Sequence, residues 1–210
     1  MKRLAIIGSG DLGELIAYHA TNDNHFNVVG FFDDFGNDNT KIMGKIKDVQ
    51  AQFDLGLFDY LMIGIGYKHM KFRKELYDKF KNIIPFGNVI HSSSYVDSSV
   101  SIGEGVFILP GCTIDKHVIL GNNVLLNTSV VIAHDSTIMS HCFISPAASI
   151  AGKTIVEECC IIGINATLID NLKITEFTQI AGGAVVIDNI NKPGLYTGVP
   201  AKFKKNNNYL

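Results

Sequence analysis

Aliphatic residues recur every six positions through the second half of the chain, without a break. Seventeen consecutive positions from Ile90 to Val186 hold isoleucine, leucine or valine at this spacing. Neither an α-helix nor the two-residue alternation of a simple strand produces a strict period of six. The repeat predicts a parallel β-helix, in which short strands alternate with turns and every sixth side chain points into a narrow prism.

Small or short side chains accompany this repeat four positions after most of the aliphatic residues, where they fit beside the larger group inside the prism. The aliphatic positions are Ile90, Val96, Ile102, Ile108, Ile114, Leu120, Leu126, Ile132, Ile138, Ile144, Ile150, Val156, Ile162, Leu168, Ile174, Ile180 and Val186. The short residues are Cys112, Val118, Val124, Val130, Ser136, Cys142, Ala148, Cys160, Ala166 and Ala184.

The first 88 residues follow a different pattern, in which apolar runs alternate with segments of helical character. We expect a small Rossmann-like parallel α/β sheet here, because strands that alternate with helices form such sheets. The chain therefore divides into a domain over 1–88 and a β-helical domain over 89–210. The expected strands lie near 2–7, 27–32, 60–65 and 83–86, and the expected helices end near 22 and span about 67–80.

The overall composition excludes several classes of function. The net charge is −2, with acids and bases nearly balanced, so a basic footprint for nucleic acid is missing. The longest apolar runs are too short to span a membrane, and the start of the chain does not have the pattern of a secretory signal. The four cysteines include no C-x-x-C pair, which favours reduced thiols and a cytoplasmic protein over a zinc site or disulfides.

A glycine motif follows the first expected strand. Gly8, Gly10 and Gly13 fit the pattern G-x-G-x-x-G before a helix, and Asp33 lies twenty residues beyond Gly13. Such glycines let phosphates approach the backbone, and the acid accepts a hydrogen bond from a ribose hydroxyl. NAD is the obvious ligand for this pattern. However, 88 residues form only one mononucleotide-binding half, so a nucleotide with one diphosphate, such as a nucleotide-sugar, fits better.

The β-helix also places one histidine in an unusual setting. Three hexapeptides make one triangular coil, so residues 18 apart stack on the same corner of the prism. His134 therefore lies one coil above Lys116 and one coil below Gly152, with neighbouring strands about 4.8 Å apart. Asp135 follows His134 directly, and at a corner both side chains are able to face the same space.

This corner has the groups that an acyl transfer needs. The nearby Lys116 favours neutral imidazole, which is the form of His134 that acts as a general base. The backbone N–H of Gly152 would hold a developing oxyanion close to that base. We therefore predict His134 and Asp135 as the catalytic pair, against the alternative of a solvated pair at an exposed turn. His117 and His141 are interpreted as ordinary structural or surface residues. A metal site of His117, His134 and His141 is disfavoured, because His141 falls on a different corner.

Several stretches together resemble the NeuD/PglD-type sugar acetyltransferases, which N-acetylate nucleotide-linked 4-amino sugars. The resemblance spans nearly the whole chain, in the right order, and the combination of FFDDF with LLNTSVVIAHD is its most specific part. The matching stretches are GSGDLG, FFDDF, GIG, NVIHSS, LLNTSVVIAHD, ASIAG, IIGINA, QIAGGAVV and GVPAK.

The resemblance implies a left-handed β-helix and a homotrimer, with acetyl-CoA as co-substrate between adjacent β-helices and no metal. It implies that His134 is the general base, with Asp135 as its acidic neighbour, and that the Gly152 N–H contacts the thioester carbonyl. Ile164 and Gly182 would line the acetyl-CoA groove. The N-terminal domain would hold the sugar nucleotide through Gly8, Ser9, Gly10, Gly13, Asp33, Asp34, Gly64 and Gly66.

One position departs from the family pattern. Members often carry a second histidine near the bound thioester, where this chain has Phe143, a side chain that cannot donate a hydrogen bond. Two alternatives to the N-acetyltransferase remain open. One is an O-acetyltransferase acting on a sialic-acid-like sugar, and the other is a trimer that binds nucleotide sugars without catalysis.

Overall fold

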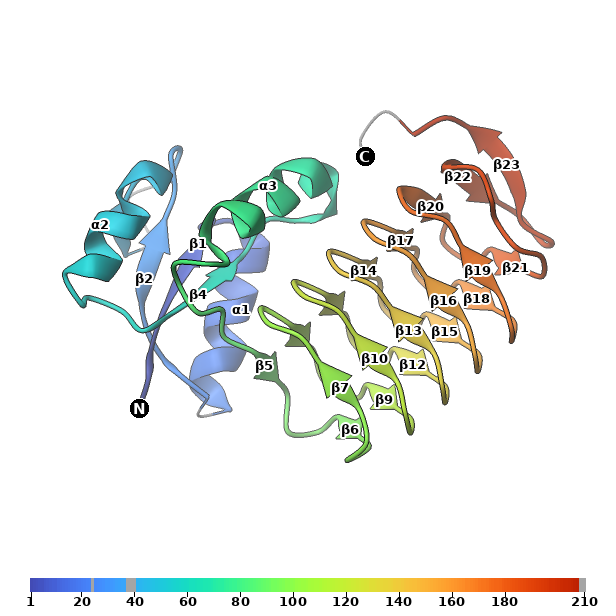
Figure 1. Cartoon of the computed structure of the whole chain (residues 1–210), viewed down its shortest axis with the longest axis horizontal. Helices are drawn as coiled ribbons and strands as arrows, with labels where there is room; N and C mark the ends of the chain where they lie inside the picture. Colours follow the sequence, from blue (N-terminus) through green and yellow to red (C-terminus); the bar gives the residue numbers. More distant parts are fainter. Residues whose placement is uncertain (24, 37–40, 208–210) are drawn as a thin grey trace. The chain divides into compact units, whose positions relative to one another are not determined.

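The computed structural model describes residues 1–23, 25–36 and 41–207, and it divides into two compact units, Met1–Val89 and Ile90–Leu210. The predicted fold class is confirmed: a small α/β domain precedes a parallel β-helix (Figure 1). No helix among the described residues is long and apolar enough to cross a membrane.

The first unit is built on a parallel sheet whose described strands have the order β3-β2-β1-β4. Its core consists of buried aliphatic and aromatic side chains from the strands and from the helices beside them. The strands are β1 (Arg3–Ile7), β2 (Asn27–Phe32), β3 (Ile42–Gly44) and β4 (Tyr60–Ile63). The helices are α1 (Asp11–Asn22), α2 (Val49–Asp54) and α3 (Met70–Phe80), with short 3-10 turns η1 (Ile46–Asp48) and η2 (Tyr67–His69).

Two parts of this unit differ from the prediction. The expected strand over 83–86 is reduced to a single parallel bridge between Phe86 and Leu61. Pro85 within it has no backbone N–H, so continuous ladder pairing is not available there. The elements β3, η1 and α2 lie between the second and third expected strands and are not visible in the apolar pattern.

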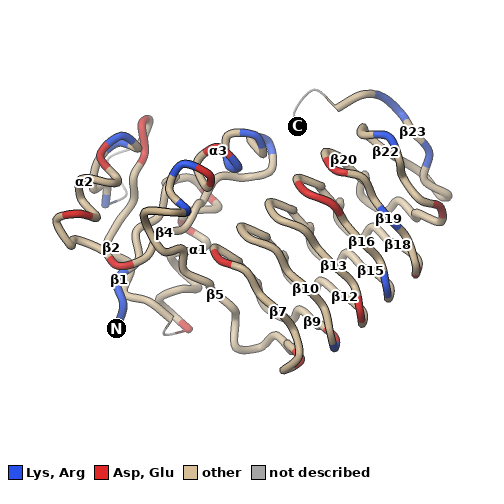
Figure 2. The backbone as a smooth tube through the Cα atoms, viewed as in Figure 1, with Lys and Arg blue, Asp and Glu red and all other residues tan. Residues whose placement is uncertain are grey.

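The second unit is a β-helix of three parallel sheets whose strands stack one coil above another. Register confirms the predicted coil of 18 residues: Ile132 pairs with Ile150, and Ile138 pairs with Val156. The repeating aliphatic side chains fill the prism and are buried from Ile108 onward. Charged residues lie mostly on the turns of the coils, as Figure 2 shows.

Most strands of the β-helix contain two residues. One sheet contains β7 (Ser101–Ile102), β10 (Ile119–Leu120), β13 (Thr137–Ile138), β16 (Ile155–Val156) and β19 (Lys173–Ile174). A second contains β6 (Tyr95–Val96), β9 (Thr113–Ile114), β12 (Val131–Ile132), β15 (Ser149–Ile150), β18 (Thr167–Leu168) and β21 (Val185–Val186). The third contains β5 (Val89–Ile90), β8 (Phe107–Ile108), β11 (Leu125–Leu126), β14 (Phe143–Ile144), β17 (Ile161–Ile162), β20 (Thr178–Ile180), β22 (Gly194–Thr197) and the antiparallel β23 (Lys202–Lys205).

The corners of the prism share one backbone conformation. Every sixth residue from His117 to Phe177 has a positive φ, between 54° and 66°. Such values are uncommon for residues other than glycine, asparagine and aspartate, so the repeat imposes them. This conformation turns the chain sharply, and it leaves corner side chains such as His117 and Asp135 exposed, whereas Asn123, His141 and Cys159 on another corner are buried. Function in a β-helix is therefore expected at the corners, and the His134–Asp135 pair lies at one of them.

Candidate active site

His134 lies on the corner between β12 and β13, and backbone hydrogen bonds hold this corner to its neighbours. The Asp135 N–H donates to the Lys116 carbonyl at 3.0 Å, and the Lys153 N–H donates to the His134 carbonyl at 2.9 Å. Main-chain atoms therefore fix the stack, whichever side chains it carries. The structure places Lys116, His134 and Gly152 one above another, as the coil arithmetic predicts.

The His134 imidazole is oriented by its neighbour. Its Nδ1 lies 2.9 Å from Asp135 Oδ2, with the two side chains 45% and 38% exposed. Hydrogen bonds from His134, and then from His117, hold the pKa of the Asp135 carboxyl below its ordinary value. An ionised carboxylate only accepts hydrogen bonds, so Nδ1 of His134 carries the proton. In the neutral ring, Nε2 then has a free lone pair and is able to act as a base.

A second histidine shares the same carboxylate. His117 Nδ1 lies 3.0 Å from Asp135 Oδ1, so Asp135 bridges two imidazoles from adjacent coils. The interpretation of His117 as an ordinary surface residue misses this contact. The sequence does contain the signal, because His117 stands 18 residues before Asp135 and therefore stacks directly below it.

Gly152 is in contact with the face of this histidine. A Cβ added to Gly152 would lie 2.9 Å from both Cε1 and Nε2 of the His134 ring. Among the hydrogen bonds of the described residues, none uses the Gly152 N–H. The glycine thus leaves room for the imidazole, and its backbone N–H is available to a ligand at the same corner.

Replacing Gly152 by alanine is expected to lower kcat for the proposed transfer by about tenfold or more, since the new methyl group displaces the ring that must face the substrate. The backbone of Gly152 lies outside the left-handed region, so alanine adds no backbone strain. Initial rates and circular dichroism would be measured for this variant and for Lys153→Ala, a change at the next position of the same turn. Wild-type activity in Gly152→Ala would rule out the steric role of the glycine.

Ile164 and Gly182 lie together on a different corner, between the third and second sheets. The Gly183 N–H donates to the Ile164 carbonyl at 2.8 Å, and Ile164 is 61% exposed. The structure therefore brings these two residues together but does not place them on the His134 corner. One face of the six-stranded sheet separates the two corners. Phe143, at the position of the expected second histidine, is buried in β14.

The glycines of the first unit fall into two groups. Gly8, Gly13 and Gly64 are packed against one another: a Cβ on Gly13 would overlap the Gly8 carbonyl oxygen, and a Cβ on Gly64 would lie 2.5 Å from the Gly13 Cα. Gly8 also has a φ of +97°. By contrast, a Cβ on Gly10 or Gly66 would meet nothing within 4 Å. Close backbone packing explains why Gly8, Gly13 and Gly64 are glycines. Only Gly10 and Gly66 have open space beside them.

The two predicted acids hold the loops of this unit. Asp33 Oδ2 accepts hydrogen bonds from the Ser9 N–H and hydroxyl, both at 2.8 Å, and Oδ1 accepts one from the Phe35 N–H at 2.8 Å. Partial burial by itself raises the pKa of the Asp33 carboxyl, but these three hydrogen bonds together bring its pKa below the ordinary value. Asp34 Oδ1 accepts from the Ile46 N–H at 3.0 Å.

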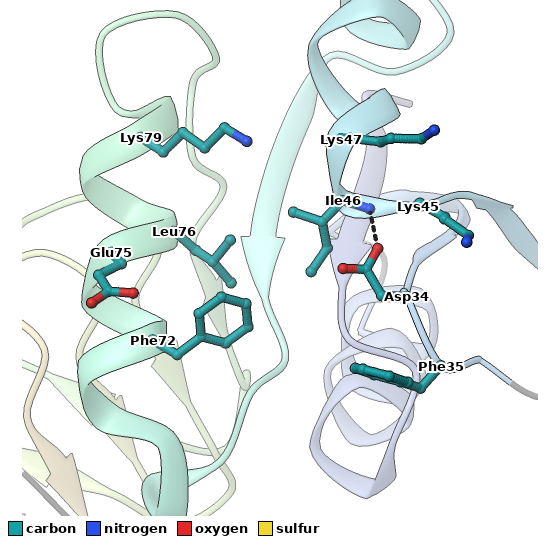
Figure 3. Close-up of a pocket in the computed structure, with 9 residues that line it drawn as sticks. All are labelled: Asp34, Phe35, Lys45, Ile46, Lys47, Phe72, Glu75, Leu76 and Lys79. Carbon is teal, nitrogen blue, oxygen red and sulfur yellow. Dashed lines mark hydrogen bonds between the residues drawn. The ribbon is translucent and has the colours of Figure 1, made fainter.

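A pocket of about 680 Å³ opens beside Asp34. Figure 3 shows its two walls, one from α3 and the other from the segments around Asp34 and Ile46. Three lysines, two acidic side chains and two aromatic rings line it, so it offers both charged groups and flat rings to a ligand. These residues come from two separate stretches, 34–47 and 72–79, and the second has helical spacing. Neither stretch alone indicates a pocket, because only the tertiary fold brings the two together. The lining residues are Asp34, Phe35, Lys45, Ile46, Lys47, Phe72, Glu75, Leu76 and Lys79.

No group of three histidine, cysteine or acidic side chains within the described residues is arranged to hold a metal ion. His117 and His134 share Asp135, whereas the buried His141 lies 3.1 Å from the Asn123 amide nitrogen on another corner.

Comparisons with known proteins agree with this architecture. Over 104 residues the chain is 38% identical to a UDP-3-O-acylglucosamine N-acyltransferase of Bordetella avium, covering 48% of this chain and 29% of that protein. The chain thus spans less than a third of the length of the curated relatives it matches. A variant of GDP-perosamine N-acetyl transferase from Caulobacter crescentus, in complex with CoA and GDP-perosamine, has a TM-score of 0.91 at 25% identity, covering 98% of both chains.

Two further matches cover the N-terminal part of the chain. The acetyltransferase domain of PglB from Neisseria gonorrhoeae shares the fold, with a TM-score of 0.89 at 22% identity, covering 97% of this chain and all of that one. Residues 3–80 match the family model of the PglD N-terminal domain. This match and the likeness to the Caulobacter enzyme confirm the resemblance of the chain to the NeuD/PglD-type sugar acetyltransferases.

Proposed function

We propose that this chain is an acetyl-CoA-dependent N-acetyltransferase acting on the 4-amino group of a nucleotide-linked amino-deoxy sugar. The observation that carries the proposal is His134, whose Nδ1 is held by Asp135 and whose ring lies against Gly152. The same architecture is found over nearly the full length of a sugar N-acetyl transferase in complex with CoA and GDP-perosamine.

In the proposed mechanism the acetyl group passes directly from sulfur to nitrogen. The neutral sugar amine attacks the thioester carbonyl carbon as His134 Nε2 takes one of its protons. The tetrahedral oxyanion accepts a hydrogen bond from the Gly152 N–H. When the carbon–sulfur bond breaks, His134 returns the proton to the CoA thiolate. The products are a sugar amide and free CoA thiol, and no residue of the chain is acylated.

We assign the nucleotide to the N-terminal domain, residues 1–88. The open space at Gly10 and Gly66 lets a diphosphate approach the backbone of these two loops. Asp33 has accepting capacity left for a ribose hydroxyl after its three hydrogen bonds. The lysines of the neighbouring pocket add positive charge, and Phe35, 96% exposed, offers a ring on which a base is able to stack.

We assign acetyl-CoA to the β-helical domain, residues 89–210. The exposed Ile164 beside Gly182 offers an apolar surface for the pantetheine arm. Six residues of the coil, one face of the six-stranded sheet, separate this corner from the His134 corner, and this separation suits an elongated ligand. Exposed Ile119, Val131 and Ile155 on the flat faces support assembly as a homotrimer. The four cysteines are buried and form no disulfide in the described residues, which supports the reducing, cytoplasmic location that we propose for the reaction.

The test is turnover with a defined panel of acceptors. Thiol release from acetyl-CoA would be followed with UDP-, GDP- and dTDP-linked 4-amino-4,6-dideoxy sugars, and separately with sialic acid as a hydroxyl acceptor. We expect turnover on one amino sugar and none on sialic acid. Turnover on sialic acid alone would establish the O-acetyltransferase instead, and failure to bind acetyl-CoA would leave only a nucleotide-sugar-binding protein.

A further inference from the structure

We propose that His117 is a positioning residue for this reaction, because it holds the Asp135 carboxylate in the orientation that selects the base-competent tautomer of His134. The expected effect of His117 on kcat rests on the proposed function. The expected effect on the tautomer of His134 does not, because it depends only on the two imidazoles and the carboxylate of this corner.

The carboxylate of Asp135 is divided between the two rings. Oδ1 lies 3.0 Å from His117 Nδ1, and Oδ2 lies 2.9 Å from His134 Nδ1. The lowered pKa of Asp135 keeps this group ionised near neutral pH, so it accepts from both sides. Each neutral ring therefore carries its proton on Nδ1, and each Nε2 is left with a lone pair.

His117 is itself held from below by a polar ladder. The backbone N–H of His117 donates to Ser99 Oγ at 2.9 Å, which fixes the main chain from which the imidazole projects, and the Ser99 hydroxyl donates to Asp97 Oδ1 at 2.6 Å. The Ser99 N–H donates to the same Asp97 oxygen at 2.9 Å. The ladder thus runs from Asp97 through Ser99, His117 and Asp135 to His134, across three successive coils.

This arrangement matters because the corner is open to solvent. The His117, His134 and Asp135 side chains are 60%, 45% and 38% exposed. An exposed aspartate with one partner exchanges that partner for water, and the neutral side chain of an unconstrained histidine prefers the proton on Nε2. With Oδ1 anchored by His117, Oδ2 stays directed at His134 Nδ1. The Nε2 atom is then kept free to accept the proton of the amine.

Two variants of the full chain separate positioning from a merely structural role. His117→Ala removes the donor. His117→Asn keeps an N–H donor close to the position of Nδ1, and asparagine tolerates the positive φ of 59° at this site well. The tautomer of His134 would be read from its imidazole ¹⁵N chemical shifts at pH 9, in wild type and in both variants.

We expect His134 to carry its proton on Nδ1 in wild type and in His117→Asn, and to shift toward the Nε2–H form in His117→Ala. In parallel, kcat should fall about tenfold in His117→Ala, with an unchanged KM for acetyl-CoA, and return to near wild type in His117→Asn. An unchanged His134 spectrum in His117→Ala would overturn the proposal. Because the spectrum needs no substrate, this result is independent of whether the wild type turns over any amino sugar.

Discussion

Replacing His134 by alanine is expected to lower kcat for acetyl transfer by about 10²-fold, the lower end of the range for general base catalysis. The lower end applies because a neutral amine is already a fair nucleophile and gains less from a base than a hydroxyl does. The variant loses Nε2 while Asp135 and Gly152 remain. KM for acetyl-CoA should change little, since the expected CoA residues Ile164 and Gly182 lie on another corner.

The fold should tolerate this change. The side chain of His134 is about half exposed, and the corner is held by backbone hydrogen bonds of Asp135 and Lys153 that alanine leaves in place. Steady-state rates would be measured beside His91→Ala, which removes a histidine from the first coil of the same β-helix. If His134→Ala kept more than about a third of the wild-type kcat, His134 would not be the base.

Replacing Gly13 by alanine is expected to destabilise the N-terminal domain by about 3 kcal/mol, at the upper end of the cost of overpacking. The added methyl group would overlap the carbonyl oxygen of Gly8. This oxygen belongs to the backbone, so the overlap cannot be removed by rotation of a side chain. The clash can be relieved only if α1 moves off the sheet.

Gly10→Ala is the matched control, since its added methyl group would have no atom within 4 Å outside its own chain neighbours. Urea unfolding would be followed at 222 nm, because the described α-helices all lie in the first unit. Gly10→Ala should unfold within about 1 kcal/mol of wild type. It should nevertheless bind the nucleotide sugar about tenfold more weakly, since its methyl group occupies the space proposed for the diphosphate. Equal stability of Gly13→Ala and wild type would refute the packing role.

The β-helix and its corner stacks are predictable from the sequence because each hexapeptide has a fixed length and no insertion breaks the register. That regularity places Gly152 beside His134 from spacing alone. The same arithmetic applied one position later pairs His117 with Asp135, but a lone exposed histidine gives no reason to apply it. The spacing that predicts this contact is present in the sequence, but nothing in the sequence singles out His117 from the other exposed residues.

The N-terminal domain is less predictable in detail. The G-x-G-x-x-G pattern does not reveal that Gly13 and Gly64 serve packing while Gly10 and Gly66 border open space, because that division depends on how α1 meets β4. The pocket lysines Lys45 and Lys79 come from separate elements, and only tertiary folding brings them together.

The most direct test of the proposed N-acetyl transfer is to identify the bond that joins the acetyl group to the sugar in the product. The accepted nucleotide sugar would be incubated with the enzyme and acetyl-CoA labelled with ¹³C at the carbonyl, and the product would be studied by heteronuclear NMR. We expect a labelled amide carbonyl that is correlated with the proton at C4 of the sugar and is stable to hydroxylamine. Label found in a hydroxylamine-sensitive ester, or only in free acetate, would contradict N-acetyl transfer.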